Sequence, residues 1–199
     1  MYQANEIANA LQSGGAILIA TDTVYGLAAL PSIPEAVEKI YLLKKRPKSM
    51  YLPIMVAKIE DLEKIGFIIT ENAKKIFKSD LVPGAVTFIL EINKEKTTPD
   101  WMKNRTEAAI RIPDNKLLLN VLEETGPLFV TSANLHGVPQ TPNNVKDILA
   151  ELNGTPDLIV EDGEGKEIPS TIINCRFNPP KIERYGLISE ATITKILEK

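Results

Sequence analysis

Short apolar runs alternate with amphipathic segments along almost the whole chain, and this alternation limits the possible fold more than any other feature. Residues 16–20 form a continuous apolar run, as expected of a strand that is buried on both faces. Residues 34–43 place apolar side chains at helical spacing, so a helix is expected to begin at or near Pro34. The pattern predicts an α/β protein with a mixed sheet.

The remaining segments fit the same scheme. Helices are predicted at residues 5–12, 59–65, 71–77, 116–124 and 145–152, and Ser189 is expected to cap a last one. Strands are predicted at residues 52–57, 86–92, 108–112, 128–130, 158–160, 171–174 and 181–184. Residues 21–27 are interpreted as a loop and residues 93–107 as a polar connection. Because no repeat or Pro/Gly-rich linker interrupts the chain, residues 1–199 are expected to form a single domain.

Composition excludes several classes of protein. A hydrophobic fraction of 44% and a charged fraction of 25% are those of an ordinary soluble protein. A net charge of −3 argues against nucleic-acid binding over the whole surface. One cysteine, Cys175, and one histidine, His136, exclude a disulfide framework and a metal site rich in either residue. No targeting segment and no apolar run long enough to span a membrane is found, so a cytoplasmic protein without a membrane partner is expected.

Two polar clusters that lie far apart in the sequence predict one anion-binding site. Residues 44–48 carry four cations in five positions, and residues 131–134 place a Ser and an Asn just after an apolar run. Such clusters suit a nucleotide site beyond the carboxyl ends of strands in an open sheet. The alternative interpretation is a solvated cap of cations at a helix C-terminus, together with an ordinary Ser or Asx turn.

These clusters belong to a longer ordered set of short segments. The segments are residues 21–27 (TDTVYGL), 44–47 (KKRP), 83–87 (PGAVT), 111–113 (RIP), 132–134 (SAN) with Gly137, 169–171 (PST), and Arg184. The chain that carries them resembles the YrdC/Sua5 family of threonylcarbamoyl-AMP synthases. Each segment is weak alone, but in this order they are specific, and they span nearly the whole chain. The resemblance implies the short, single-domain form of the family, with a twisted mixed sheet and a basic concave face.

The resemblance also implies a reaction. L-Threonine, bicarbonate and ATP would give threonylcarbamoyl-AMP and pyrophosphate, which makes the chain a nucleotidyltransferase. Mg²⁺ would accompany the nucleotide, and no dedicated metal site on the protein is expected. A separate transferase would then move the threonylcarbamoyl group to an adenosine in tRNA, forming N6-threonylcarbamoyladenosine. Fixed cations and donors would lower the barrier mainly by positioning and electrostatics.

Roles carried over position by position define a candidate site. Catalytic roles are implied for Lys44, Arg46, Ser132 and Asn134. ATP contacts are implied for Lys44, Arg46, Asn134, Thr141 and Arg184. Threonine contacts are implied for Thr23, Arg111, Ser132 and Ser170, and Arg111 would pair with the threonine carboxylate. From the residues alone, Arg111 could equally be a surface cation, Ser170 a loop hydroxyl and Arg184 half of an exposed ion pair.

The chain departs from the family pattern at three positions near the expected site. Tyr51 stands where a proline is usual, Met50 where a small polar residue often lies near ATP, and Met55 where some relatives have a histidine.

Two other functions compete with the synthase. The first is a module of the same fold that binds tRNA or double-stranded RNA without synthase activity. The second is the domain that handles carbamoyl-adenylate inside larger carbamoyltransferases, which also carry Cys-rich zinc segments. A single cysteine counts against the second function. Salt dependence would distinguish the RNA-binding module from the synthase, because affinity for RNA falls steeply with salt whereas affinity for ATP at a buried site responds less.

Overall fold

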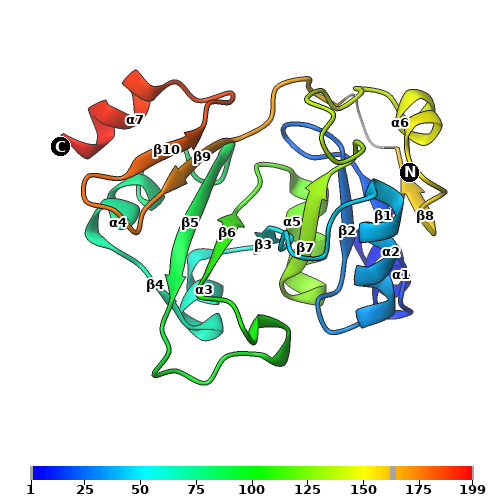
Figure 1. The fold of residues 1–199 in the computed structure, drawn as a ribbon, viewed down its shortest axis with the longest axis horizontal. Coiled ribbons are helices and arrows are strands. Elements are labelled where there is room, and N and C mark those ends of the chain that lie inside the picture. The colour runs from blue at the N-terminus through cyan, green and yellow to red at the C-terminus, as the bar shows by residue number, and fades with distance from the viewer. Residues whose placement is uncertain (1, 162–164, 199) are drawn as a thin grey trace.

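One mixed sheet runs through the whole molecule and contains strands from both the N-terminal and the C-terminal parts of the chain (Figure 1). The coordinates are a computed structural model that describes residues 2–161 and 165–198. Within these residues the strand order is β10-β9-β5-β6-β3-β7-β2-β1-β8, and β4 pairs with β5 beside this path. The strands are β1 (Ile17–Ile19), β2 (Gly26–Ala29), β3 (Ile54–Met55), β4 (Phe67–Ile68), β5 (Val86–Ile92), β6 (Glu107–Arg111), β7 (Leu128–Ser132), β8 (Leu158–Val160), β9 (Thr171–Asn174) and β10 (Lys181–Arg184).

The sheet mixes both kinds of strand pairing. The pairs β1–β8, β3–β6 and β5–β9 are parallel, whereas the other pairs are antiparallel. Since β5 and β9 are separated by many residues, their pairing brings the start of β9 beside the start of β5, with Val86 opposite Thr171. The α/β class with a mixed sheet is therefore confirmed.

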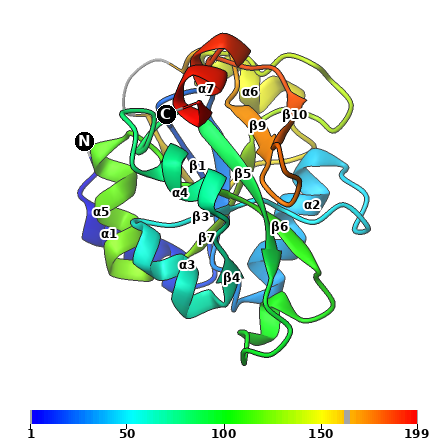
Figure 2. The ribbon, with the colours of Figure 1, turned by 90° about the vertical axis from the view of Figure 1, so that its left-hand side faces the viewer.

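Helices cover the sheet on more than one side (Figure 2). They are α1 (Ala4–Gln12), α2 (Pro34–Lys44), α3 (Ile59–Ile65), α4 (Glu71–Phe77), the 3₁₀ turn η1 (Asp100–Met102), α5 (Lys116–Thr125), α6 (Val145–Glu151) and α7 (Glu190–Leu197). The side chain of Ser189 accepts from the Thr192 amide, so the predicted cap of the last helix is confirmed.

Strand β1 shows why its apolar run is continuous. Ile17 and Ile19 belong to the buried cluster that α1 and α5 share, whereas Leu18 belongs to the larger cluster that includes Ile40 of α2. Successive side chains of a strand point to opposite faces, so both faces of β1 are covered. Burial of this kind stabilises the fold by about 1.5–3 kcal/mol for each large aliphatic side chain.

The structure differs from the predicted elements mainly in short strands. Residues 26–29 form β2, whose first two residues fall in the loop expected at 21–27, and residues 67–68 form β4, which the pattern does not predict. The sequence Gly-Leu-Ala-Ala lacks the β-branched residues that indicate a strand. A glycine is needed at its start because a Cβ on Gly26 would lie 2.8 Å from Cγ1 of Val130 on the neighbouring strand. The predicted strand at 52–57 is reduced to Ile54–Met55.

Throughout residues 2–161 and 165–198, no helix combines the length and the apolar character that crossing a lipid bilayer requires.

Candidate functional site

A cavity of about 380 Å³ lies over the centre of the sheet, with walls from strands far apart in the sequence. Most of the predicted site residues line it, namely Thr23, Arg46, Arg111, Ser132, Ser170 and Arg184. A volume of this size suits a small molecule. The predicted meeting of the two polar clusters is supported, because Arg46 from residues 44–48 and Ser132 from residues 131–134 line the same cavity.

The position of the cavity corrects one part of the prediction. Arg111, Ser132 and Arg184 are indeed the last residues of β6, β7 and β10. The wall, however, also includes Ala109, two residues before Arg111 on the same strand. Alternate residues of a strand share one face, so the cavity extends over a face of the sheet. The cavity is therefore not confined to the region beyond the strand ends. It fits better the concave face of the sheet that the family resemblance implies.

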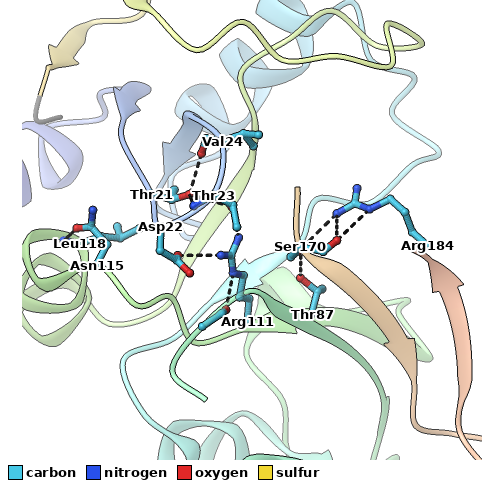
Figure 3. A network of polar contacts seen from close by, with 11 residues as sticks. Thr21, Asp22, Thr23, Val24, Thr87, Arg111, Asn115, Leu118, Ser170 and Arg184 are labelled. Atoms are coloured by element: carbon cyan, nitrogen blue, oxygen red, sulfur yellow. Dashed lines mark hydrogen bonds and ion pairs between the residues drawn. The ribbon is translucent and has the colours of Figure 1, made fainter. Parts of the chain in front are cut away.

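Arg111 is the most deeply buried guanidinium of the site, with 5% of its surface exposed. Its Nη2 lies 2.8 Å from Oδ1 of Asp22, in an ion pair that lacks the direction of a hydrogen bond. Its Nη1 donates to Oγ1 of Thr23 at 2.7 Å, and its Nε donates to the Gly84 carbonyl at 3.0 Å (Figure 3). Burial lowers the pKa of Arg111, and the charge of Asp22 opposes this shift. The interpretation of Arg111 as a surface cation is wrong.

A second polar group links β5, β9 and β10. The Thr87 and Ser170 hydroxyls are 2.7 Å apart, and Arg184 Nη2 donates to the Ser170 carbonyl at 2.8 Å and to its Oγ at 3.2 Å (Figure 3). Burial lowers the pKa of Arg184, and the positive charge of Arg111 acts in the same direction. Arg184 is thus held by Ser170 instead of forming an exposed ion pair.

Arg46 reaches the cavity from the segment that follows α2. Its Nε donates to the Met50 carbonyl at 3.0 Å, and its Nη2 donates to the Tyr51 carbonyl at 3.1 Å. The guanidinium therefore orders the turn at residues 46–51 while it lines the cavity. Its Nη1, which makes neither of these two bonds, is a donor suited to an anion.

Lys44 has a different position from the one predicted. Its side chain is buried, with 2% of the residue exposed, and it does not line the cavity. Its Nζ donates to the Ser132 carbonyl, to the Asn134 carbonyl at 2.6 Å and to Asn134 Oδ1 at 3.4 Å. The solvated cap is therefore wrong, since Lys44 ties α2 to the end of β7 and the segment after it. The ATP contact stays a prediction, which the position of Lys44 outside the cavity wall does not favour. Burial lowers its pKa to about 7, Arg46 adds to the shift, and Glu151 opposes it.

The Ser-x-Asn segment is held from several sides. Ser132 Oγ donates to Asn134 Oδ1 at 2.6 Å, and Asn134 Nδ2 donates to the Val138 carbonyl at 2.6 Å. The amide of Ala133 donates to the Tyr25 carbonyl at 2.8 Å. Asn134 and Thr141 are buried and are not among the residues that line the cavity. Ser132 is therefore the residue of this segment that faces the cavity.

Two further residues belong to the site, although no role was predicted for either. Asp22 lies against Arg111, and Thr87 lies against Ser170 (Figure 3). Both fall within segments that carry the family resemblance, at 21–27 and 83–87, and this was the available signal. In the described part of the chain, the cavity wall has three guanidinium groups and no carboxylate. The same residues contain no cluster of His, Cys, Asp and Glu that could hold a metal ion.

Comparison with known proteins gives consistent matches. The chain is 33% identical over 197 residues to threonylcarbamoyl-AMP synthase of Bacillus subtilis, and the aligned region covers 98% of this chain and 56% of that protein. The structure of Sua5 from P. abyssi complexed with L-threonine matches with a TM-score of 0.85 at 28% identity, over 97% of this chain and 56% of that one. The structure of E. coli YciO matches with a TM-score of 0.82 at 26% identity, over 96% and 92% of the two chains.

The chain thus spans about half the length of the first two proteins and nearly all of the third. The family model Sua5_yciO_yrdC, described as telomere recombination, matches residues 9–186. That range contains the cavity and all the residues that were predicted to form it. The chain belongs to the Sua5/YciO/YrdC family.

Proposed function

We propose that this chain is an L-threonylcarbamoyladenylate synthase of the nucleotidyltransferase class, which uses L-threonine, bicarbonate and ATP. The observation that carries the proposal is the charge of the cavity, where Arg46, Arg111 and Arg184 meet without a carboxylate among the described lining residues. Asp22 offsets the charge of Arg111, and the remaining excess of positive charge around the cavity favours a ligand or pair of ligands with several negative charges. A nucleoside triphosphate beside an amino acid carboxylate has that charge. The threonylcarbamoyl-AMP synthase of B. subtilis, which matches 98% of this chain, supports the choice.

The chemistry makes use of these groups without a covalent nucleophile. The amine of threonine and bicarbonate form a carbamate with loss of water. A carbamate oxygen then attacks the α-phosphorus of ATP, the bond to the β-phosphate oxygen breaks, and pyrophosphate leaves. Negative charge grows on the phosphoryl oxygens and the leaving group, where fixed guanidinium groups lower the barrier. Mg²⁺ enters with the nucleotide and neutralises part of the phosphate charge.

The contacts suggest how the two organic substrates divide the cavity. Arg111, backed by Asp22 and Thr23, offers a rigid guanidinium to the threonine carboxylate. Arg46 suits the phosphates of ATP, and Ser132, which lines the same cavity, keeps its expected place beside threonine. Arg184 and Ser170 are hydrogen-bonded to each other, so the ATP and threonine subsites meet there. Lys44 and Asn134 act by fixing the segment that presents Ser132.

The product defines the expected partner and compartment. Threonylcarbamoyl-AMP is a mixed anhydride, so a transferase that moves its acyl group to an adenosine of tRNA must consume it. The proposed compartment is the cytoplasm, where ATP and tRNA are available.

Pyrophosphate release tests the function. Purified protein with ATP and Mg²⁺ should release pyrophosphate only when both threonine and bicarbonate are present, and serine or valine should replace threonine poorly. Turnover that is equal without threonine would remove the assignment. The matched control is Tyr2→Ala, a change of an exposed residue outside the cavity wall, which should leave turnover unchanged.

RNA binding without synthesis is the alternative that remains to be compared. The cavity of about 380 Å³ suits a small molecule rather than a nucleic-acid duplex, which favours the enzyme. For the synthase, affinity for double-stranded RNA should be weak. For a module that contacts several RNA phosphates, affinity should fall by roughly 10³-fold or more between about 50 and 200 mM salt. Tight RNA binding together with absent pyrophosphate release would favour the alternative.

A further inference from the structure

The rim of the cavity at residues 50–52 is held from two sides. From within the fold, Arg46 donates to the carbonyls of Met50 and Tyr51, and the hydroxyl of Tyr41 donates to the Met50 carbonyl at 3.2 Å. From the other side, Arg105 Nη1 donates to the Leu52 carbonyl at 3.1 Å. The backbone that carries Tyr51 is therefore fixed by hydrogen bonds that do not depend on a ligand.

The Tyr51 side chain is fixed as well. The guanidinium carbon of Arg105 lies 4.4 Å from the centre of the Tyr51 ring and 4.8 Å from the centre of the Phe129 ring. The Tyr51 hydroxyl donates to the Asn104 carbonyl at 3.4 Å. The Tyr51 ring thus packs on the Arg105 guanidinium, which in turn packs against Phe129. At a partly desolvated site, a cation–π contact favours the packed position of a ring over the free one by about tenfold.

This ordered ring is nevertheless half exposed and borders the cavity. Tyr51 keeps 50% of its surface exposed and is part of the cavity wall, whereas Arg105 is not. A large aromatic side chain that is immobilised and left open at a charged cavity loses little conformational freedom when a flat ligand stacks on it. Nucleobases are ligands of this kind, and they stack on aromatic side chains whatever their hydrogen-bonding edge.

The position of Arg46 indicates which flat group would arrive there. Its guanidinium lies 3.1 Å from the carbonyl oxygen of Tyr51, so a phosphate bound by Arg46 lies close to the segment that carries the ring. Arg46 and Tyr51 also line the same cavity, so a nucleotide whose phosphates bind Arg46 lies in the space that the Tyr51 side chain borders.

We propose that Tyr51, braced by Arg105, is the stacking platform for the purine base of the nucleotide whose phosphates Arg46 binds. The proposal rests on the proposed function for the identity of the nucleotide. Tyr51 is then a specificity-determining residue that touches the base, and Arg105 is a positioning residue that acts through the Tyr51 ring. A merely structural role for Tyr51, as a link between the segments at 46–52 and 104–105, makes different predictions.

Equilibrium titration with ATP, UTP and inorganic tripolyphosphate separates the two roles. Tyr51→Ala should weaken ATP binding by about tenfold, equivalent to about 1.4 kcal/mol, and should change tripolyphosphate binding by less than twofold. Tyr51→Phe, which keeps the ring and removes the hydroxyl, should bind ATP within about twofold of the wild type. The wild type should prefer ATP to UTP, and Tyr51→Ala should lose most of that preference because a purine offers more stacking area.

Control variants complete the test. Arg105→Met removes the brace and should give a smaller loss of ATP affinity than Tyr51→Ala, with tripolyphosphate unaffected. Tyr2→Ala, a matched tyrosine with 42% of its surface exposed and no place in the cavity wall, should leave all three affinities unchanged.

Each remaining outcome overturns the proposal. Equal loss of ATP and tripolyphosphate in Tyr51→Ala would mean that the ring only links two segments. Unchanged ATP affinity in that variant would mean that the base lies elsewhere, although the proposed synthase would stand. A wild type that binds no ATP at all would remove both the platform and the proposed function, and the pyrophosphate assay above identifies that case independently.

Discussion

The Lys44 side chain lies inside the protein, and the oxygen atoms that accept its hydrogen bonds belong to residues 132 and 134. Removal of this side chain would take a hydrogen-bond donor away from these oxygens. We expect Lys44 to influence the cavity indirectly, by holding the segment that includes Ser132. Its loss should reduce both activity and stability, in contrast to the small stability effect of a solvated cation.

The pH dependence of stability should reveal Lys44. Its pKa falls from 10.5 in the unfolded chain to about 7 in the folded protein, because burial disfavours the ammonium. Between these values the unfolded chain binds a proton that the folded protein does not, so stability should rise with pH. Urea denaturation at pH 7 and pH 9 should show a gain on the order of 1–2 kcal/mol in the wild type. Lys44→Met lacks the proton and should lack this gain, so parallel pH profiles for the two proteins would count against the argument.

Arg111 should not tolerate a change to lysine. A single ammonium cannot contact Asp22, Thr23 and the Gly84 carbonyl together, so Arg111→Lys should raise the threonine KM by roughly tenfold. ATP binding without threonine, measured by calorimetry, should change by less than about twofold. Arg176→Lys is the matched control, since Arg176 pairs with Glu107 outside the cavity wall. A loss confined to ATP affinity would show that the two subsites are assigned the wrong way round.

The part of the site that could be predicted consists of residues that line the cavity, such as Arg111 and Ser170. Their contacts with threonine stay predictions. Asp22 and Thr87 could not be assigned from their types, since their partners lie at positions 111 and 170, far away in the sequence. The hydrogen bonds of Lys44 could not be predicted for the same reason, because only the tertiary fold places the Ser132 carbonyl within reach of its Nζ.

Among the elements, the end of α2 determines where the basic cluster points. Lys45 adopts a left-handed conformation with φ of 49°, its amide donates to Leu42, and the Arg46 amide donates to Tyr41 at 2.9 Å. These are the hydrogen bonds of a Schellman motif. The reversal of the chain turns Lys44 into the fold and releases Arg46 toward the cavity.

Lys45 should be a site where glycine stabilises the protein. A left-handed conformation costs a residue with a Cβ about 1–2 kcal/mol, part of which glycine recovers after its greater entropy in the unfolded chain. Lys45→Gly should therefore raise the free energy of unfolding by about 0.5–1 kcal/mol in urea denaturation. Lys45→Ala keeps the Cβ and is the control, for which no gain is expected. A gain of equal size in both variants would point to the lysine charge instead of the backbone.

Elements with strong patterns were predictable, whereas those set by neighbours were not. The helices at 59–65 and 71–77 have the predicted bounds, because their own apolar spacing specifies them. Strand β2 was missed because it has no β-branched residue and because its first residue, Gly26, is required by close contact with β7, which no local pattern reveals. Strand β3 is short because it is a bridge between β6 and β7 with only two paired residues.

For the molecule as a whole, substrate binding should appear as stabilisation. The cavity draws its wall from both halves of the sheet, so a ligand there favours the folded state of the entire chain. ATP with Mg²⁺ at about 100 times its Kd should add about 2.7 kcal/mol, or about 5–10 °C in Tm for a chain of this length. Adenosine at the same concentration should produce a much smaller shift because it lacks the phosphates. Equal shifts with adenosine would argue against the guanidinium site.

The parallel pairing of β5 with β9 has a consequence for synthesis on the ribosome. The start of β5 meets the start of β9, and Thr87 is joined to Ser170 and through it to Arg184. A nascent chain that has emerged only as far as β7 already contains Arg46, Arg111 and Ser132, but it lacks Ser170 and Arg184 and therefore one side of the cavity wall. The cavity should thus be completed only late in translation, when the segment from Ser170 to Arg184 docks beside β5.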